Sequence, residues 1–176
     1  MKKVRYLLPM AVAASLLVLS LGCASGPKVG SRAPSFEAVD DAGHDVSLAG
    51  YEGKVVVMYF WATWCAPCVV SGPAMQELHA RLSQNPDVVV VGVHYDNKGD
   101  PVVYNEKNGY TFDNIPDGRE VVSRYGIKKI PSFVIVGTEG TVLHNQVGYS
   151  DGDKREFERI IDTHLDANNR VSRGSS

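Results

Sequence analysis

A continuous apolar segment that leads directly into a pair of cysteines restricts the fold of this chain more than any other feature. Residues 54–60 read Lys-Val-Val-Val-Met-Tyr-Phe, a run without polar alternation that is typical of a strand buried on both faces. Cys65 and Cys68 follow after a short turn, and residues 67–82 then carry apolar side chains at helical spacing. The pattern predicts a buried strand, a C-x-x-C turn and a helix in immediate succession.

Strand and helix patterns alternate along the rest of the chain. The helix after the cysteines is expected to bury the apolar residues that recur every four positions, which are Val70, Ala74, Leu78 and Leu82. Further strands are expected at 88–93, 133–136 and 141–147, and further helices at 101–107, 119–125 and 151–165. This order predicts an α/β fold in which helices cover both faces of a mixed sheet.

The first cysteine of the pair is expected at the N-terminus of a helix. Unpaired backbone N–H groups and the helix dipole favour the thiolate there, and the thiolate is the nucleophile in disulfide exchange. Pro67 suits the first helical turn, because its missing N–H would have no partner at that position. We therefore predict Cys65 as the nucleophile and Cys68, one turn further, as the resolving thiol and the less exposed of the two.

Two other uses of the pair are a structural disulfide and a zinc site. The chain-entropy model gives so small a ring roughly 2 kcal/mol of stabilisation, less than a typical structural bridge. Zinc would need two further ligands, and neither a second C-x-x-C nor a histidine at suitable spacing accompanies the pair. The pattern favours reversible redox chemistry through a Cys65–Cys68 disulfide, with no metal and no other cofactor.

The N-terminal residues have the form of an export signal. Lys2, Lys3 and Arg5 precede an apolar run at 7–21, which is shorter than the roughly 20 apolar residues of a membrane-spanning helix. The run ends in Ser-Leu-Gly-Cys23, which resembles the lipobox of bacterial lipoproteins, whose cysteine is lipidated and becomes the new N-terminus. An ordinary secretory signal and an uncleaved anchor are the alternatives.

The chain is therefore expected to contain one domain, lipid-anchored through Cys23 outside the cytoplasm, on the periplasmic side or the cell surface. The expected parts are a signal peptide at 1–22, a tether at 23–29, a globular domain at 30–165 and a disordered tail at 166–176. Disulfides persist in such an oxidising compartment. The formal net charge of −2 and the lack of a basic stripe argue against nucleic acid as a partner.

Several separated segments resemble thioredoxin-like proteins, and among them the exported TlpA/ResA-like branch. Residues 60–68, Phe-Trp-Ala-Thr-Trp-Cys-Ala-Pro-Cys, are similar to the active-site segment of that family. Residues 30–36, 46–48 and 53–54 are similar to the extra N-terminal β-hairpin of the branch, and residues 125–133 to the segment with the family's cis-proline. The resemblance implies a thioredoxin fold with an N-terminal β-hairpin extension and a central insertion.

The resemblance also implies roles for residues near the cysteines. Pro131 would be cis and pack beside the disulfide, which would leave the backbone of Ile130 open to a substrate strand. Trp64 would form a flat contact surface beside Cys65, whereas Trp61 would belong to the core.

Two positions depart from the relatives. Thioredoxin carries a buried Asp six residues before its first cysteine, where this chain has Tyr59, and ResA-like proteins carry a Glu three residues after the second, where it has Ser71. Either acid would help to take a proton from the buried thiol. The proton acceptor is therefore unassigned, with water, Tyr59 and Ser71 as candidates, and we expect slower resolution by Cys68 than in relatives that carry an acid.

The remaining polar residues are interpreted as surface groups: His44, His79, His94, His144 and His164, and the loop acids Asp96 and Asp117. The predicted function is that of an extracytoplasmic thiol–disulfide oxidoreductase. By family analogy it reduces protein disulfides, for example in cytochrome c maturation, and a membrane redox protein supplies its electrons. A peroxiredoxin-like thiol peroxidase and a Cu(I)-binding metallochaperone are the alternatives.

Overall fold

The computed structural model describes the backbone of residues 26–174 and the side chains of residues 26–170. The predicted signal peptide, Cys23 and the first part of the tether lie outside the described residues. Within the described part of the chain, no helix combines the length and the apolar character needed to span a bilayer.

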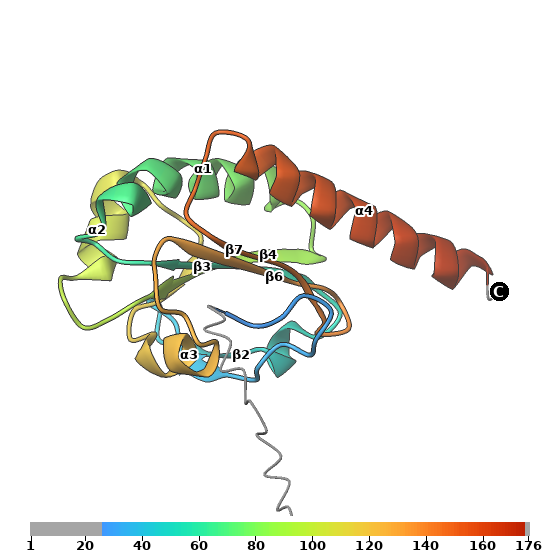
Figure 1. The fold of residues 1–176 in the computed structure, drawn as a ribbon, viewed down its shortest axis with the longest axis horizontal. Helices are drawn as coiled ribbons and strands as arrows, with labels where there is room; N and C mark the ends of the chain where they lie inside the picture. The colour runs from blue at the N-terminus through green and yellow to red at the C-terminus, as the bar shows by residue number, and fades with distance from the viewer. Residues whose placement is uncertain (1–25, 175–176) are drawn as a thin grey trace, which may run out of the picture.

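A five-stranded mixed sheet forms the centre of the fold (Figure 1), with the strand order β5-β4-β3-β6-β7. Its strands are β3 (Val55–Trp61), β4 (Val88–His94), β5 (Asp113–Ile115), β6 (Ser132–Val136) and β7 (Val142–Val147). The central strand β3 is parallel to β4 and antiparallel to β6, so the predicted mixed sheet is confirmed. The edge strand β5 was not predicted, because three residues are too few to show a period.

Helices cover both faces of the sheet, as predicted (Figure 1). On one face lie α1 (Ala66–Leu82) and α4 (Asp153–Gly174), and on the other α3 (Arg119–Arg124) and the short 3₁₀ helix η1 (Ala49–Tyr51). The helix α2 (Pro101–Asn108) lies near the N-terminal end of α1. All seven residues of β3 are buried, because alternate side chains enter the two cores on opposite faces of the sheet.

The N-terminal hairpin implied by the family resemblance is present. Its strands β1 (Glu37–Val39) and β2 (Asp45–Ser47) pair antiparallel outside the main sheet. Phe36 is buried in the core on the α3 side, and Leu48 packs against that core. The hairpin therefore helps to cover the face opposite α1.

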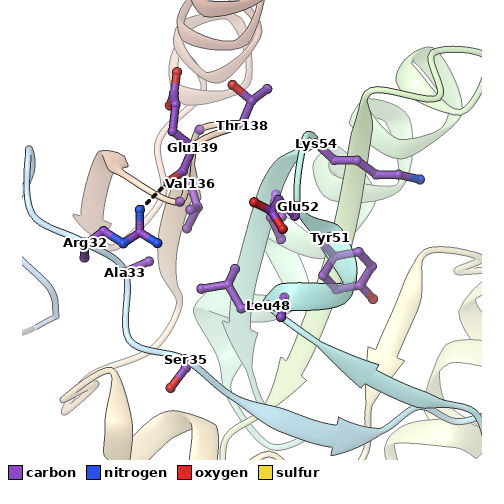
Figure 2. Close-up of a pocket in the computed structure, with 14 residues that line it drawn as sticks. Arg32, Ala33, Ser35, Leu48, Tyr51, Glu52, Lys54, Val136, Thr138 and Glu139 are labelled. Carbon is purple, nitrogen blue, oxygen red and sulfur yellow. Dashed lines mark hydrogen bonds between the residues drawn. The ribbon is translucent and has the colours of Figure 1, made fainter.

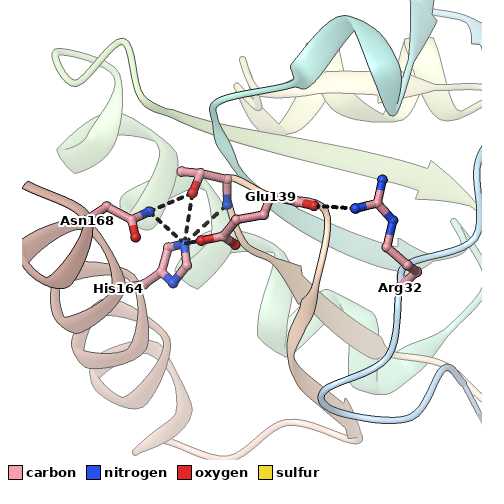
Figure 3. Close-up of polar contacts among 5 residues, drawn as sticks. Arg32, Glu139, His164 and Asn168 are labelled. Atoms are coloured by element: carbon pink, nitrogen blue, oxygen red, sulfur yellow. Dashed lines mark hydrogen bonds and ion pairs between the residues drawn. The ribbon is translucent and has the colours of Figure 1, made fainter. Parts of the chain in front are cut away.

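The last helix continues beyond the predicted end of the domain. The prediction of a disordered tail is wrong for residues 166–174, which α4 includes. Asn168 donates a hydrogen bond to Thr138 Oγ1 at 2.6 Å, and His164 Nε2 lies 3.1 Å from the same oxygen, as Figure 3 shows. These contacts hold α4 to the turn between β6 and β7, whose Glu139 carbonyl accepts a hydrogen bond from Arg32.

The helix α1 buries a different stripe from the predicted one. Leu78 and Leu82 are buried as expected, but Val70 is 64% exposed, so its predicted place in the core is wrong. The buried stripe begins with Cys68 and Ser71 and continues through Met75. Because the stripe starts at the cysteine, Val70 faces solvent on the other side of the helix.

Candidate active site

Cys65 is the N-cap residue of α1, where the sequence predicted the start of the helix. Its carbonyl accepts hydrogen bonds from the backbone N–H groups of Cys68 and Val69, at 2.9 and 3.2 Å. Pro67 occupies the first turn, where its missing N–H removes no helical hydrogen bond. Among residues 66–69, only the N–H of Ala66 lies outside these bonds. This group and the positive end of the helix dipole favour a thiolate at Cys65.

The two cysteines form a disulfide with a Cα–Cα distance of 5.2 Å. The prediction that Cys68 is the less exposed of the two is wrong for this oxidised state, since both residues are 4% exposed. A partner must therefore first contact the exposed residues around Cys65.

Trp64 supplies a large exposed surface next to the disulfide. It is 53% exposed, and its indole Nε1 donates to both carboxylate oxygens of Asp96 at 3.2 Å. Asp96 was interpreted as a solvated loop acid, but it fixes the orientation of this ring. Asp117, the other loop acid considered, instead pairs with Arg119 at 2.8 Å.

The peptide bond between Ile130 and Pro131 is cis, as the family resemblance implies. Ser132, the next residue, pairs with Phe60 across the β3–β6 ladder. The cis peptide therefore lies at the same edge of the sheet as the segment that leads to Cys65. Ile130 packs against the core that contains both cysteines, while Trp61 is 2% exposed and belongs to that core as expected.

The two positions that carry acids in the relatives hold a pair of hydroxyls in contact with each other. Tyr59 Oη donates to the carbonyl oxygen of Cys68 at 3.0 Å and lies 3.0 Å from Ser71 Oγ. Both residues are buried, and burial raises the pKa of the Tyr59 phenol. The phenol is therefore protonated at neutral pH, and it acts as a donor rather than as the base that would deprotonate Cys68.

His94 is buried, so its interpretation as a surface residue is wrong. It is 1% exposed and packs edge-on against Trp61 at 5.4 Å between ring centroids. Its Nδ1 donates to the carbonyl oxygen of Asp96 at 2.6 Å, and its buried Nε2 has no hydrogen-bond partner among the described residues. Burial lowers the pKa of His94, although the Asp96 carbonyl opposes this effect.

Replacing His94 by glutamine is expected to weaken the dependence of stability on pH between pH 7 and pH 5. An unfolded histidine takes up a proton near pH 6.5, whereas the folded protein protonates His94 only at lower pH. The unfolded state therefore binds more protons in this interval, and the free energy of unfolding falls as the pH falls.

Urea denaturation at pH 7, 6 and 5 measures this effect. His79, whose pKa is also lowered by partial burial, still contributes in the same direction, so the slope is expected to decrease rather than vanish. The exposed Val39, which does not titrate, provides the control, since the V39Q slope should match wild type. An unchanged slope in H94Q would contradict the expectation.

A cavity of about 340 Å³ (Figure 2) is lined in part by Val56, near the start of β3. The disulfide follows the other end of that strand. Arg32, Leu48, Tyr51 and Lys54 are among the residues that line the cavity. None of the predicted site residues does so. Among residues 26–174, no group of three or more His, Cys, Asp or Glu side chains is placed to hold a metal ion.

Known sequences similar to this chain include thioredoxin-like proteins and thiol-disulfide oxidoreductases. Residues 29–145 match the AhpC/TSA family. The chain is 31% identical over 141 residues to the thiol-disulfide oxidoreductase ResA of Geobacillus kaustophilus, a match that covers 77% of each chain. It is also 30% identical over 139 residues to the thioredoxin-like protein YneN of Bacillus subtilis, which covers 78% of this chain and 81% of that protein.

Solved structures share the fold of this chain. A candidate thiol:disulfide interchange protein DsbE from Chlorobium tepidum superposes with a TM-score of 0.70 at 32% identity, covering 78% of this chain and 98% of that chain. A candidate protein disulfide isomerase from Bacteroides thetaiotaomicron superposes with a TM-score of 0.75 at 22% identity, covering 85% and 99%. The second similarity supports the fold alone.

Proposed function

Because the chain belongs to the AhpC/TSA family of thioredoxin-like proteins and is a thiol–disulfide oxidoreductase, we propose that it reduces disulfides of exported proteins outside the cytoplasm. Cys65 is the proposed nucleophile and Cys68 the proposed resolving thiol. Trp64, Pro67, Ile130 and Pro131 support the site. As one example of a substrate, we propose a disulfide of a client protein in cytochrome c maturation.

One observation carries this proposal: a disulfide sits at the first turn of a helix, directly after an exposed tryptophan in the chain and at the same end of the sheet as a cis-proline. In the reduced protein, the Cys65 thiolate attacks one sulfur of a client disulfide, and the client's other sulfur leaves as a thiolate. The Cys68 thiol then loses its proton and attacks Cys65, which releases the reduced client and restores the disulfide seen here. A protein of the membrane is the proposed source of the two electrons for the next cycle.

Localisation is part of the same proposal. Export through a signal at 1–22 and lipid attachment at Cys23 would hold the domain at a membrane surface by a short tether at 23–29. The names of the relatives suggest the redox reaction, and the sequence of the N-terminus motivates the anchor. Metabolic labelling with a radioactive fatty acid, compared between wild type and Cys23→Ala, tests the attachment.

The reduced full-length protein is expected to reduce both insulin and a C-x-x-C-H peptide disulfide, the motif to which c-type haem attaches. Insulin turbidity and thiol release measure the two reactions, with the fully oxidised protein as the control. Faster consumption of peroxide than of either disulfide would instead favour a thiol peroxidase. Tight Cu(I) binding without disulfide reduction would favour a metallochaperone.

A further inference from the structure

The N-terminal half of α1 exposes apolar side chains where the rest of the helix exposes charged ones. Val69 and Val70 are 52% and 64% exposed. The exposed positions of the C-terminal half include Glu77 and Arg81, which form ion pairs with side chains of α4. The solvent-facing positions of α1 therefore carry charged side chains only in the half that lies beside α4 (Figure 1).

The exposed valines continue the surface that begins next to the disulfide. No charged residue occurs between Thr63 and Gln76, and α1 has no acidic side chain in its first turn. We call this strip the apolar α1 surface. It consists of the exposed residues Trp64, Ala66, Pro67, Val69, Val70 and Pro73.

Disulfide exchange itself brings a client protein to the apolar α1 surface. Disulfide exchange at Cys65 forms a covalent bond to a cysteine of the partner, so the residues that flank this cysteine come to lie around Cys65. Val69 follows Cys65 by four residues, which places it one turn further along the helix on the same side. Val70 follows the exposed Ala66 by four residues, so it lies beside Val69 on the solvent face of the helix. A flanking client residue that extends over this face contacts both valines.

On the basis of the proposed function, we infer that Val69 and Val70 select clients whose disulfide cysteine is flanked by apolar residues. An apolar flank gains free energy when it covers these side chains, in proportion to the area removed from water. A charged flank would lose hydration against a strip that offers it no opposite charge. The nearby carboxylate of Asp96 already accepts hydrogen bonds from Trp64.

The test compares two synthetic peptides that contain the same disulfide, one flanked by leucine and the other by serine. Wild type is expected to prefer the leucine peptide by about tenfold in kcat/KM. The double variant V69Q/V70Q should reduce this preference to about twofold or less, because glutamine is polar but forms helices at least as readily as valine. V39Q, at a valine 51% exposed on β1, is the matched control and should keep the wild-type preference.

The outcomes separate this inference from the proposed function. A wild-type protein that reduces neither peptide would contradict the function itself. Equal kcat/KM for the two peptides, or a preference that survives in V69Q/V70Q, would overturn only the selection of apolar flanks. Sedimentation and vesicle-binding measurements test whether a second copy of the chain or a lipid membrane covers the apolar α1 surface instead. A wild-type dimer that V69Q/V70Q dissociates, or vesicle binding that it abolishes, would mean that a second copy or lipid covers the surface and would also overturn the inference.

Discussion

Replacing Cys65 by serine is expected to abolish disulfide reduction, with a loss on the order of a thousandfold or more. A serine hydroxyl is not ionised at neutral pH and does not attack a disulfide, whereas the cysteine thiolate does. The first step of exchange is then missing, so no covalent complex with a client can form. Thiol release from a peptide disulfide measures the loss, in a Cys23→Ser background that removes the third cysteine of the chain.

Cys68→Ser in the same background is the matched control. It keeps the nucleophile but lacks the resolving thiol, so it should accumulate a mixed disulfide with the client that mass spectrometry detects. Cys65 and Cys68 are both 4% exposed, so the loss of stability from altered packing should be similar in the two variants. If Cys65→Ser formed the mixed disulfide and Cys68→Ser did not, the assignment of the two roles would have to be reversed.

Replacing Phe133 by alanine is expected to lower the free energy of unfolding by about 3–5 kcal/mol. Phe133 is fully buried on β6. Its ring lies 5.3 Å from that of Tyr59 and 5.1 Å from that of Phe157 on α4. The truncation would leave a cavity between the central strand and the last helix, against a typical total stability of about 5–15 kcal/mol.

Chemical denaturation of the oxidised protein measures this loss, and V39A is the control. Val39 is 51% exposed on β1, so its truncation should change stability by no more than about 0.5 kcal/mol. A loss below about 1.5 kcal/mol for F133A would mean that the core refills the cavity, contrary to the expectation.

The arrangement of strand, cysteine pair and helix could be predicted from the sequence, because each part has a strong local signal. An uninterrupted β-branched run indicates β3, and Pro67 with the helical periodicity indicates α1. The cis-proline and the N-terminal hairpin were predicted from family resemblance alone. Neither has a local pattern that would have indicated it independently.

Other features depend on contacts between distant segments and could not be predicted from local patterns. The burial of His94 follows from its pairing with Trp61 in the β3–β4 ladder, and Asp96 reaches Trp64 only because the loop after β4 passes beside the end of β3. Val70 was assigned to the core because an apolar residue at helical spacing is usually buried. That rule fails where an apolar side chain serves an external partner, which is the role inferred here for Val70.

The position of β3 between two cores connects the redox chemistry to the folding equilibrium. The strand contributes alternate side chains to both cores and leads directly into the disulfide. Folding and reduction of the cysteine pair form a thermodynamic cycle. The disulfide and dithiol forms differ in their free energy of unfolding, and this difference equals the difference in the free energy of reduction between the folded and the unfolded chain. Packing near Cys65 and Cys68 can therefore set the reduction potential of the protein. A change in the distant half of either core that stabilises or destabilises both forms equally alters the free energy of unfolding but leaves the reduction potential unchanged.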